Sequence, residues 1–291
     1  MTKIARFFRK SKNPTRSFGG NLIIYVILLI FALFMALPMV FSICQALKPL
    51  DEIWVFPPHF FVSNPTLKNF TQVFELMSSF RVPFSRYVFN TVIITVIGTT
   101  GHVLIASMCA YALAKHSFPG SKIIFNAIVL SLMFSAVVTQ IPSFLIMTKL
   151  GWLNTYLPYI IPGFAGSLGL FLMKQFMEAM VPDQLIEAAY IDGAGELTVL
   201  FRIVMPMVKP AWLTLIIFSI QNFWNTGSNR MVYSERLKPL NYALSQLMGG
   251  GVTRAGVGAA AAVIMMAVPI ITFIFSQSQI IETMAASGIK E

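Results

Sequence analysis

The fold of this chain is decided by the stretch Glu187–Ala194, EAAYIDGA, and by Ile203–Pro206, IVMP, which follows it. Together they form a polar interruption between two apolar stretches. Pro182, just upstream, suits the first turn of a helix, because that position needs no amide donor. Gly193 can end the helix, because glycine accepts left-handed backbone torsions without a steric penalty. We therefore predict a short helix held between two membrane spans.

One face of this predicted helix is small and apolar, with an acidic rim. Residues at i, i+3, i+4 and i+7 share a helical face, and these positions are Leu185, Ala188, Ala189 and Asp192. The two alanines would leave the backbone uncovered, so that another protein could approach it closely. The pattern is typical of a docking element, and the alternative is an amphipathic loop in which Ala-Ala occurs by chance.

The composition excludes an ordinary soluble domain. Hydrophobic residues make up 56% of the 291 residues, and charged residues only 11%, whereas soluble domains carry roughly 25% charged residues. Several apolar runs exceed the ~18–20 residues that are needed to cross the hydrocarbon core of a bilayer. We therefore predict an all-α polytopic membrane protein.

Six transmembrane helices are predicted within a single membrane domain, residues 22–277. In chain order they are Leu22–Ala46, Val88–Ala114, Ile123–Leu145, Leu157–Met177, Met207–Asn225 and Ala255–Gln277. The two long external connections are residues 47–87 and 226–254, and the docking stretch 178–206 is cytoplasmic. Residues 1–21 and the tail 278–291 are expected to be cytoplasmic termini.

The charge distribution favours this orientation with one exception. The net charge is +10, and six basic residues precede the first span without any acid, which suits the positive-inside rule better than nucleic-acid binding. The connection 226–254 opposes the rule, because it carries Arg230, Arg236, Lys238 and Arg254. Six spans with a cytoplasmic docking stretch nevertheless require this connection to be external. Both cysteines fall in predicted spans, so no disulfide framework is indicated.

The sequence carries no pattern typical of an enzyme or a metal site. It lacks G-x-x-x-x-G-K-[ST], so the chain itself is not expected to bind ATP phosphates. The three histidines are scattered without an acid or cysteine at ligand spacing, and His102 is expected to pack between helices. Charged residues are almost missing from the spans, which argues against an ion-coupled carrier. We expect neither catalysis nor a cofactor or metal on this chain.

The docking stretch resembles the EAA motif of binding-protein-dependent ABC importers, which is Glu-Ala-Ala, three residues, Gly, nine residues, Ile-x-Leu-Pro. The matching residues are Glu187, Ala188, Ala189, Gly193, Ile203 and Pro206, with Met205 in place of the usual leucine. Leu47-Lys48-Pro49 and Asn69-Phe70 in the first long connection, and Trp224-Asn225 at the end of the fifth span, resemble carbohydrate-uptake permeases in particular. The tail departs from the family, with Thr283 and Ser287 where glycines are usual.

The resemblance implies the permease subunit of a bacterial ABC importer for a sugar or oligosaccharide. Such a subunit has the type I importer fold, with cytoplasmic termini, in the cytoplasmic (plasma) membrane. The implied partners are a second homologous permease, two ATP-binding subunits that hold ATP and Mg, an extracytoplasmic solute-binding protein and the lipid bilayer, but no nucleic acid. The implied ATPase-coupling residues are Glu187, Ala188, Ala189, Asp192, Gly193, Ile203 and Pro206.

Neutral polar residues in the spans are candidates for the solute pathway. They are Asn90, Ser135, Gln140, Asn222 and Asn225, with Trp224 as an aromatic platform. A buried amide costs on the order of 2–7 kcal/mol unless it is paired. Sugar hydroxyls would be suitable partners, and groups of neighbouring helices are the alternative.

Two other function classes stay open at this point. A permease of the same superfamily for an amino acid, phosphate or peptide would share the EAA motif. A stand-alone channel or an intramembrane enzyme would need a charged or metal-binding pore, or a catalytic pair within the spans, and the sequence shows neither.

Overall fold

The computed structural model describes residues 18–78, 80–134, 136–227, 229–249, 251 and 254–288. All regular secondary structure in these ranges is helical, which confirms the all-α prediction. The six basic residues that precede the first predicted span lie outside the described residues, and so does Ser135.

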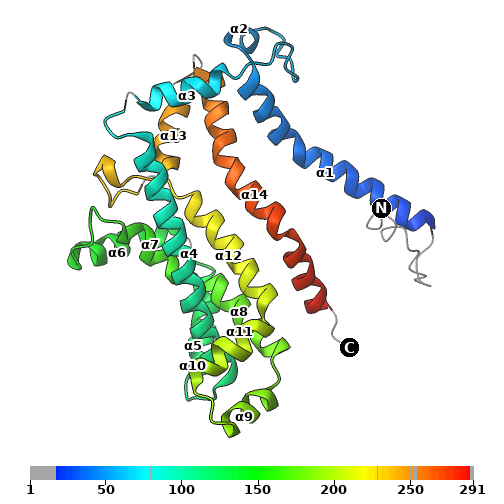
Figure 1. The fold of residues 1–291 in the computed structure, drawn as a ribbon, viewed down its shortest axis with the longest axis vertical. Helices are drawn as coiled ribbons and strands as arrows, with labels where there is room; N and C mark the ends of the chain where they lie inside the picture. Colours follow the sequence, from blue (N-terminus) through cyan, green and yellow to red (C-terminus); the bar gives the residue numbers. More distant parts are fainter. Residues whose placement is uncertain are drawn as a thin grey trace.

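The molecule is built mainly of long helices (Figure 1). The longest ones are α1 (Phe18–Leu47), α4 (Phe84–Lys115) and α14 (Ala255–Gly288). At the centre, α4 packs against α8 (Ser167–Met180) and α12 (Lys209–Trp224), and α14 packs against α12. α1 meets α14 at one end and then diverges from the other helices (Figure 1), so that most of its apolar side chains are exposed.

Four helical stretches are long and apolar enough to cross a membrane, by length and composition, among the described residues. They are Leu22–Leu47, Phe84–Lys115, Leu157–Met180 and Ala255–Gln277. A fifth results if Glu196–Met207 and Lys209–Trp224 are counted as one span that bends by 87°. Four of the six predicted spans therefore have a helical counterpart of sufficient length, and the fifth, Met207–Asn225, has one only if the bent pair is counted as a single span.

The predicted third span, Ile123–Leu145, is not one straight helix. It is divided into α5 (Ser121–Ser131) and α6 (Ala136–Lys149), and α6 extends sideways from the bundle (Figure 1). After α5 the backbone forms a tight turn, because the amides of residues 132–134 donate hydrogen bonds to the carbonyls of residues 129–131, three positions earlier. The Ser131 hydroxyl also lies 2.6 Å from that of Ser167, at the start of α8. Apolarity alone predicted the span and could not reveal this turn.

The fourth predicted span also contains a break, which is occupied by a histidine. α7 (Leu157–Phe164) and α8 are separated at Ala165 and Gly166. His102 of α4 is buried, with Nδ1 2.9 Å from the Ser219 hydroxyl on α12 and Nε2 3.3 Å from the Gly166 carbonyl. His102 therefore bridges α4, α12 and the α7–α8 break, which confirms its expected packing role.

The end of the bundle remote from residues 183–191 is closed by short helices. These are α2 (Leu50–Ile53), α3 (Lys68–Ser78), η2 (Glu235–Leu237) and α13 (Leu240–Met248). Asn69 of α3 is buried and donates to the carbonyls of Ala46 (2.9 Å) and Lys48 (2.7 Å). A Cβ on Gly256 would lie 2.7 Å from Asn69 Oδ1. The glycine at this position therefore allows α14 to pack closely against the Asn69 side chain of α3.

Replacement of Gly169 by alanine should destabilise the bundle. A Cβ at this position would lie 2.6 Å from both His102 Nε2 and Leu215 Cδ1, and overpacking of this kind costs about 1–3 kcal/mol. The matched control is Gly258→Ala on α14, where the nearest heavy atom would be 3.5 Å away. Thermal unfolding of the purified variants in detergent would measure the difference. Equal unfolding temperatures for the two variants would contradict the expected steric conflict.

Candidate functional site

The Glu-Ala-Ala stretch forms α9 (Asp183–Ile191), at the end of the molecule farthest from α2 and α3 (Figure 1). Pro182 directly precedes its first residue. At the other end the amide of Ala194 donates to the Ala189 carbonyl (2.9 Å), and that of Gly193 donates to the Tyr190 carbonyl (3.0 Å). With φ of +81° at Gly193, this is the hydrogen-bond pattern of a glycine-terminated helix. The chain therefore turns back sharply after α9.

The two alanines of the motif face different environments. Ala189 is 7% exposed and packs with Ile186 against the core that includes Val199 and Leu200. Ala188, in contrast, is exposed. The structure thus differs from the expectation that both alanines share one outward face, because Ile186 and Ala189, three residues apart, form the inward face of the helix.

The outward surface of this region combines acids with large apolar side chains. Glu187 and Asp192 are exposed. Ile191 is 86% exposed and Leu197 61%, and Leu185 is exposed as well. Clustered exposed apolar side chains mark surfaces that another molecule covers. This surface, residues 185–197, therefore has the character of a docking site.

The beginning of α9 is fastened to the end of α4 by a buried lysine. Nζ of Lys115 donates to the Val181 carbonyl (2.6 Å) and to Asp183 Oδ1 (2.7 Å). The Lys115 side chain is only 5% exposed, whereas that of Asp183 is 74% exposed. The lysine therefore holds the segment before α9 against α4, and the exposed carboxylate completes its charge pairing.

A second set of contacts fastens the end of α9 to the same part of α4. The Tyr111 hydroxyl donates to Glu196 Oε2 (3.1 Å) and lies 3.1 Å from the Tyr190 hydroxyl. His116 Nε2 lies 3.3 Å from the same Glu196 oxygen. The hydroxyls of Tyr190 and Tyr111, together with the His116 imidazole, lower the pKa of this exposed carboxyl. Both ends of α9 are thus attached to the last turn of α4.

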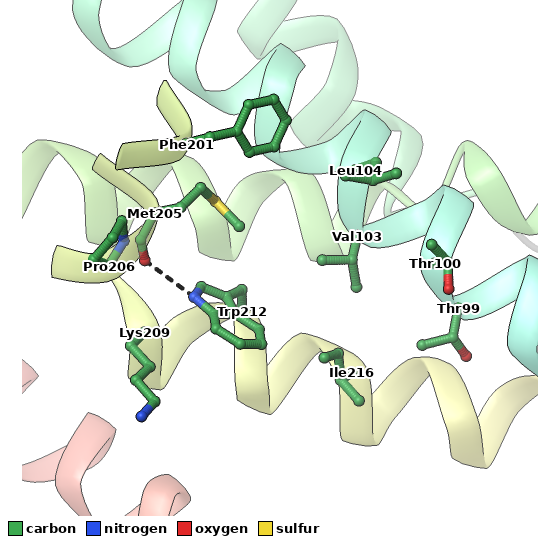
Figure 2. A pocket seen from close by; sticks show the side chains of 10 residues that line it. All are labelled: Thr99, Thr100, Val103, Leu104, Phe201, Met205, Pro206, Lys209, Trp212 and Ile216. Atoms are coloured by element: carbon green, nitrogen blue, oxygen red, sulfur yellow. Dashed lines mark hydrogen bonds between the residues drawn. The ribbon is translucent and has the colours of Figure 1, made fainter. Parts of the chain in front are cut away.

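The second half of the motif forms an arm, residues 196–207, that leads into α12. The arm comprises α10 (Glu196–Thr198), the π-helical segment η1 (Val199–Val204) and α11 (Met205–Met207). It meets α12 at 87°. Trp212 Nε1 donates to the Met205 carbonyl at 3.0 Å, next to Pro206 (Figure 2). The Ile203–Pro206 end of the motif therefore lies at the corner between the arm and α12.

A cavity of about 470 Å³ lies between this corner and α4 (Figure 2). Phe201 and Met205 of the arm face Val103 and Leu104 of α4 across it, and Lys209 of α12 is also among its lining residues (Figure 2). Its lining is mostly apolar and offers few hydrogen-bonding groups, so it does not suit a saccharide. It shows that the arm and α4 are not in close contact along their whole length.

Two of the proposed pathway residues are engaged within the protein. Asn90 is fully buried: its Nδ2 donates to the carbonyls of Arg236 (2.9 Å) and Lys238 (2.8 Å), and its Oδ1 accepts from the Tyr156 hydroxyl (2.7 Å). Trp224 is buried, and its Nε1 donates to the Met265 carbonyl (3.2 Å). In this structure both side chains join helices and connections.

The remaining pathway residues do not lie together. Gln140 lines a hollow beside residues 226–231. Asn222 lines one beside His102 and Ser219. Asn225 lines a third beside α14. The set therefore remains a prediction and is not assembled into one site by this chain alone.

The residues that hold α9 were not singled out as site residues from the sequence. Tyr111 and Lys115 lie at the end of α4 and His116 directly follows it, and the i, i+4 spacing places Tyr111 and Lys115 on one face. That polar face was the available signal. In the described part of the chain, no three His, Cys, Asp or Glu residues are grouped so that they could hold a metal ion.

Comparison with known proteins gives the class of the chain. Residues 102–284 match the family described as the binding-protein-dependent transport system inner membrane component. The chain belongs to this family, whose members are membrane-embedded, non-enzymatic subunits of bacterial ABC transporters. This places it in the bacterial plasma membrane as a multi-pass protein.

Individual relatives are permeases of named transport systems. The chain is 30% identical over 223 residues to a polygalacturonan/rhamnogalacturonan transport system permease protein of Bacillus subtilis, covering 73% of this chain and 72% of the relative. It is 26% identical over 241 residues to a melibiose/raffinose/stachyose import permease protein of the same organism, covering 81% and 84%. A bacterial ABC transporter involved in the import of alginate shares its fold, with a TM-score of 0.74, 23% identity, and coverage of 96% and 98%. The chain therefore has the type I ABC importer permease fold.

Replacement of Lys115 by methionine should loosen the start of α9. The change removes the donor to Val181 and Asp183, and a hydrogen bond from a charged group contributes about 1.5–3 kcal/mol. Amide exchange in residues 181–191 should therefore become about tenfold faster or more. Hydrogen exchange with mass spectrometry would measure it, with Lys122→Met, an exposed lysine of the next turn, as the control. Unchanged exchange in Lys115→Met would show that the lysine does not hold α9.

Proposed function

We propose that this chain forms half of the translocation pathway of an ABC importer for a sugar or oligosaccharide. A second homologous permease would supply the other half, the two permeases together would sit on two ATP-binding subunits, one of which docks at α9, and an extracytoplasmic binding protein would deliver the solute. The observation that carries the proposal is α9 itself, an exposed helix with the EAA sequence whose two ends, Asp183 and Tyr190, are bonded to α4.

The carbohydrate class is supported by the relatives. The two permeases reported above are named for polygalacturonan/rhamnogalacturonan and for melibiose/raffinose/stachyose, and the structural relative for alginate. The names belong to those proteins, and we extend to this chain only the shared class. Neutral amides such as Gln140 and Asn222, which are exposed in hollows, suit the hydroxyls of such solutes.

The proposed topology places α9 and both termini in the cytoplasm. It counts six spans, with α5 and α6 together in the place of the third. Residues 22–277 form the permease domain, 178–206 the coupling stretch, and 47–87 and 226–254 the external connections. Residues 1–21 and 278–291 are then the cytoplasmic ends.

The coupling residues have distinct proposed roles. Glu187 would pair with a basic residue of the ATPase, while Ala188 and the exposed apolar side chains around it enter a cleft on its surface. Ala189 supports α9 from inside, as its burial indicates. Gly193 provides the reversal of the chain, and Asp192 lies exposed beside it. Ile203 and Pro206 belong to the arm that carries motion into α12.

In this mechanism α4 would be the main element that transmits motion from α9 through the bundle. Its inner end holds both ends of α9, through Lys115 and Tyr111. Its outer end is bound to the connection 226–254: the Tyr87 hydroxyl donates to Glu235 (2.9 Å), and Asn90 donates to two carbonyls there. Closure of the ATPases around ATP and Mg would thus displace α9, and one continuous helix would carry the displacement to the opposite end of the molecule.

The Glu187→Arg variant tests the coupling role. It should insert and fold normally, because Glu187 is exposed, but reversal of the charge should abolish the pairing with the ATPase. Solute uptake should fall at least tenfold, while ATP hydrolysis in the purified complex is no longer stimulated by the loaded binding protein. Uptake into cells and hydrolysis in proteoliposomes are the measurements.

The matched control is Glu75→Arg, which makes the same charge change at an exposed position of α3. It should transport like the unmodified chain. Normal uptake by the Glu187→Arg variant would contradict the assignment of α9 as the coupling element.

A further inference from the structure

The connection 226–254 carries more positive charge than its place on the outside explains. It holds four basic residues and one acid, Glu235. Lys238 pairs with Glu235 at 3.1 Å, whereas no carboxylate of the described residues pairs with Arg230, Arg236 or Arg254. External connections of this length normally avoid Lys and Arg. An excess of basic residues that opposes the positive-inside orientation points to a functional use. Positive charge at the entrance of a solute pathway attracts anions.

One of these arginines lines a hollow of about 640 Å³. One wall is formed by Gln140, Ile141 and Phe144 of α6. The other is formed by residues 226, 227 and 229–231. The size lies within the range of small-molecule sites. No acidic residue is among the residues that line it.

The wall that carries Arg230 is held in place by its neighbours. Asn229 Nδ2 donates to the Pro158 carbonyl of α7 (3.2 Å), and its Oδ1 accepts from the Met231 amide (2.9 Å). The Asn154 amide donates to the Met231 carbonyl at 2.9 Å. The groups on both sides of Arg230 are therefore fixed before any ligand arrives, which reduces the entropy that binding must overcome.

Two side chains of the hollow remain available for a ligand. In the described part of the chain, neither Gln140 nor Arg230 has a hydrogen-bond or ion-pair partner, and both are exposed. A guanidinium binds a carboxylate through two parallel hydrogen bonds. A neutral amide both donates to and accepts from hydroxyls, and the ring of Phe144 offers an apolar surface to the C–H face of a pyranose.

We propose that the hollow between α6 and residues 226, 227 and 229–231 is an entry subsite for an acidic saccharide, with Arg230 bound to the carboxylate of a uronate unit and Gln140 to its hydroxyls. The proposal rests on the importer function and narrows its solute to carboxylated sugars. An anionic lipid headgroup would share the negative charge, but it lacks the ring that the amide and Phe144 suit.

The test measures binding of trigalacturonate to the complete importer in nanodiscs, without its binding protein. The matched ligand is the methyl ester of the same trisaccharide, which keeps the rings and removes the charge. The unmodified complex should bind the acid at least tenfold more tightly than the ester. Arg230→Gln should remove that preference, whereas Arg254→Gln, the same charge loss in the same connection outside the hollow, should keep it.

Each alternative result overturns the proposal. Equal affinity for the acid and the ester, or no binding of either, would exclude a uronate site. An equal loss in Arg230→Gln and Arg254→Gln would show a general effect of charge. Competition by phosphatidylglycerol, added to phosphatidylcholine nanodiscs, would identify a lipid site. If the importer still takes up a neutral oligosaccharide in these cases, the importer function stands and only the acidic subsite is lost.

Discussion

The rest of the coupling region depends on the attachment of α9 to the last turn of α4. A helix of nine residues is marginal by itself in water, and α9 has only a narrow inward face, Ile186 and Ala189, to bury. Lys115 at one end and Tyr111 at the other provide the stabilising contacts that so short a helix lacks. Each of them joins the region of α9 to α4, a helix of 32 residues. The docking surface can therefore be rigid although most of it is exposed.

The same helix, α4, organises the remainder of the bundle. Within the membrane it packs on α8 and α12, and His102 occupies the break between α7 and α8. At the far end Tyr87 and Asn90 are bonded to residues 235–238. Several other helical stretches are divided, such as α5–α6 and α7–α8, and α1 is set apart from the centre (Figure 1). Uninterrupted over 32 residues, α4 bonds directly both to the region of the docking surface and to the opposite connection.

Sequence patterns predicted what depends on neighbours along the chain, and missed what depends on rotation and distant partners. The short helix, its glycine end and the helical class follow from local rules. Whether Ala188 or Ala189 faces inward depends on how α9 lies on η1, which spacing does not determine. The partners of Asn90 are more than 60 residues away along the chain and cannot be recognised from local patterns. For this reason the sequence indicated a solute contact for its amide. Hydropathy likewise could not distinguish one span over 123–145 from two helices joined by a turn.

Gly193 illustrates how different two glycines of one membrane protein can be. A Cβ at Gly169 would collide with its neighbours, whereas nothing lies within 4 Å of a Cβ at Gly193. Glycine is favoured at position 193 only because of the backbone torsion there, with φ of +81°. Asparagine is the side chain that adopts such torsions most readily. Mutational tolerance at this position should therefore follow left-handed propensity and ignore side-chain volume, so that a large asparagine is accepted before a small alanine.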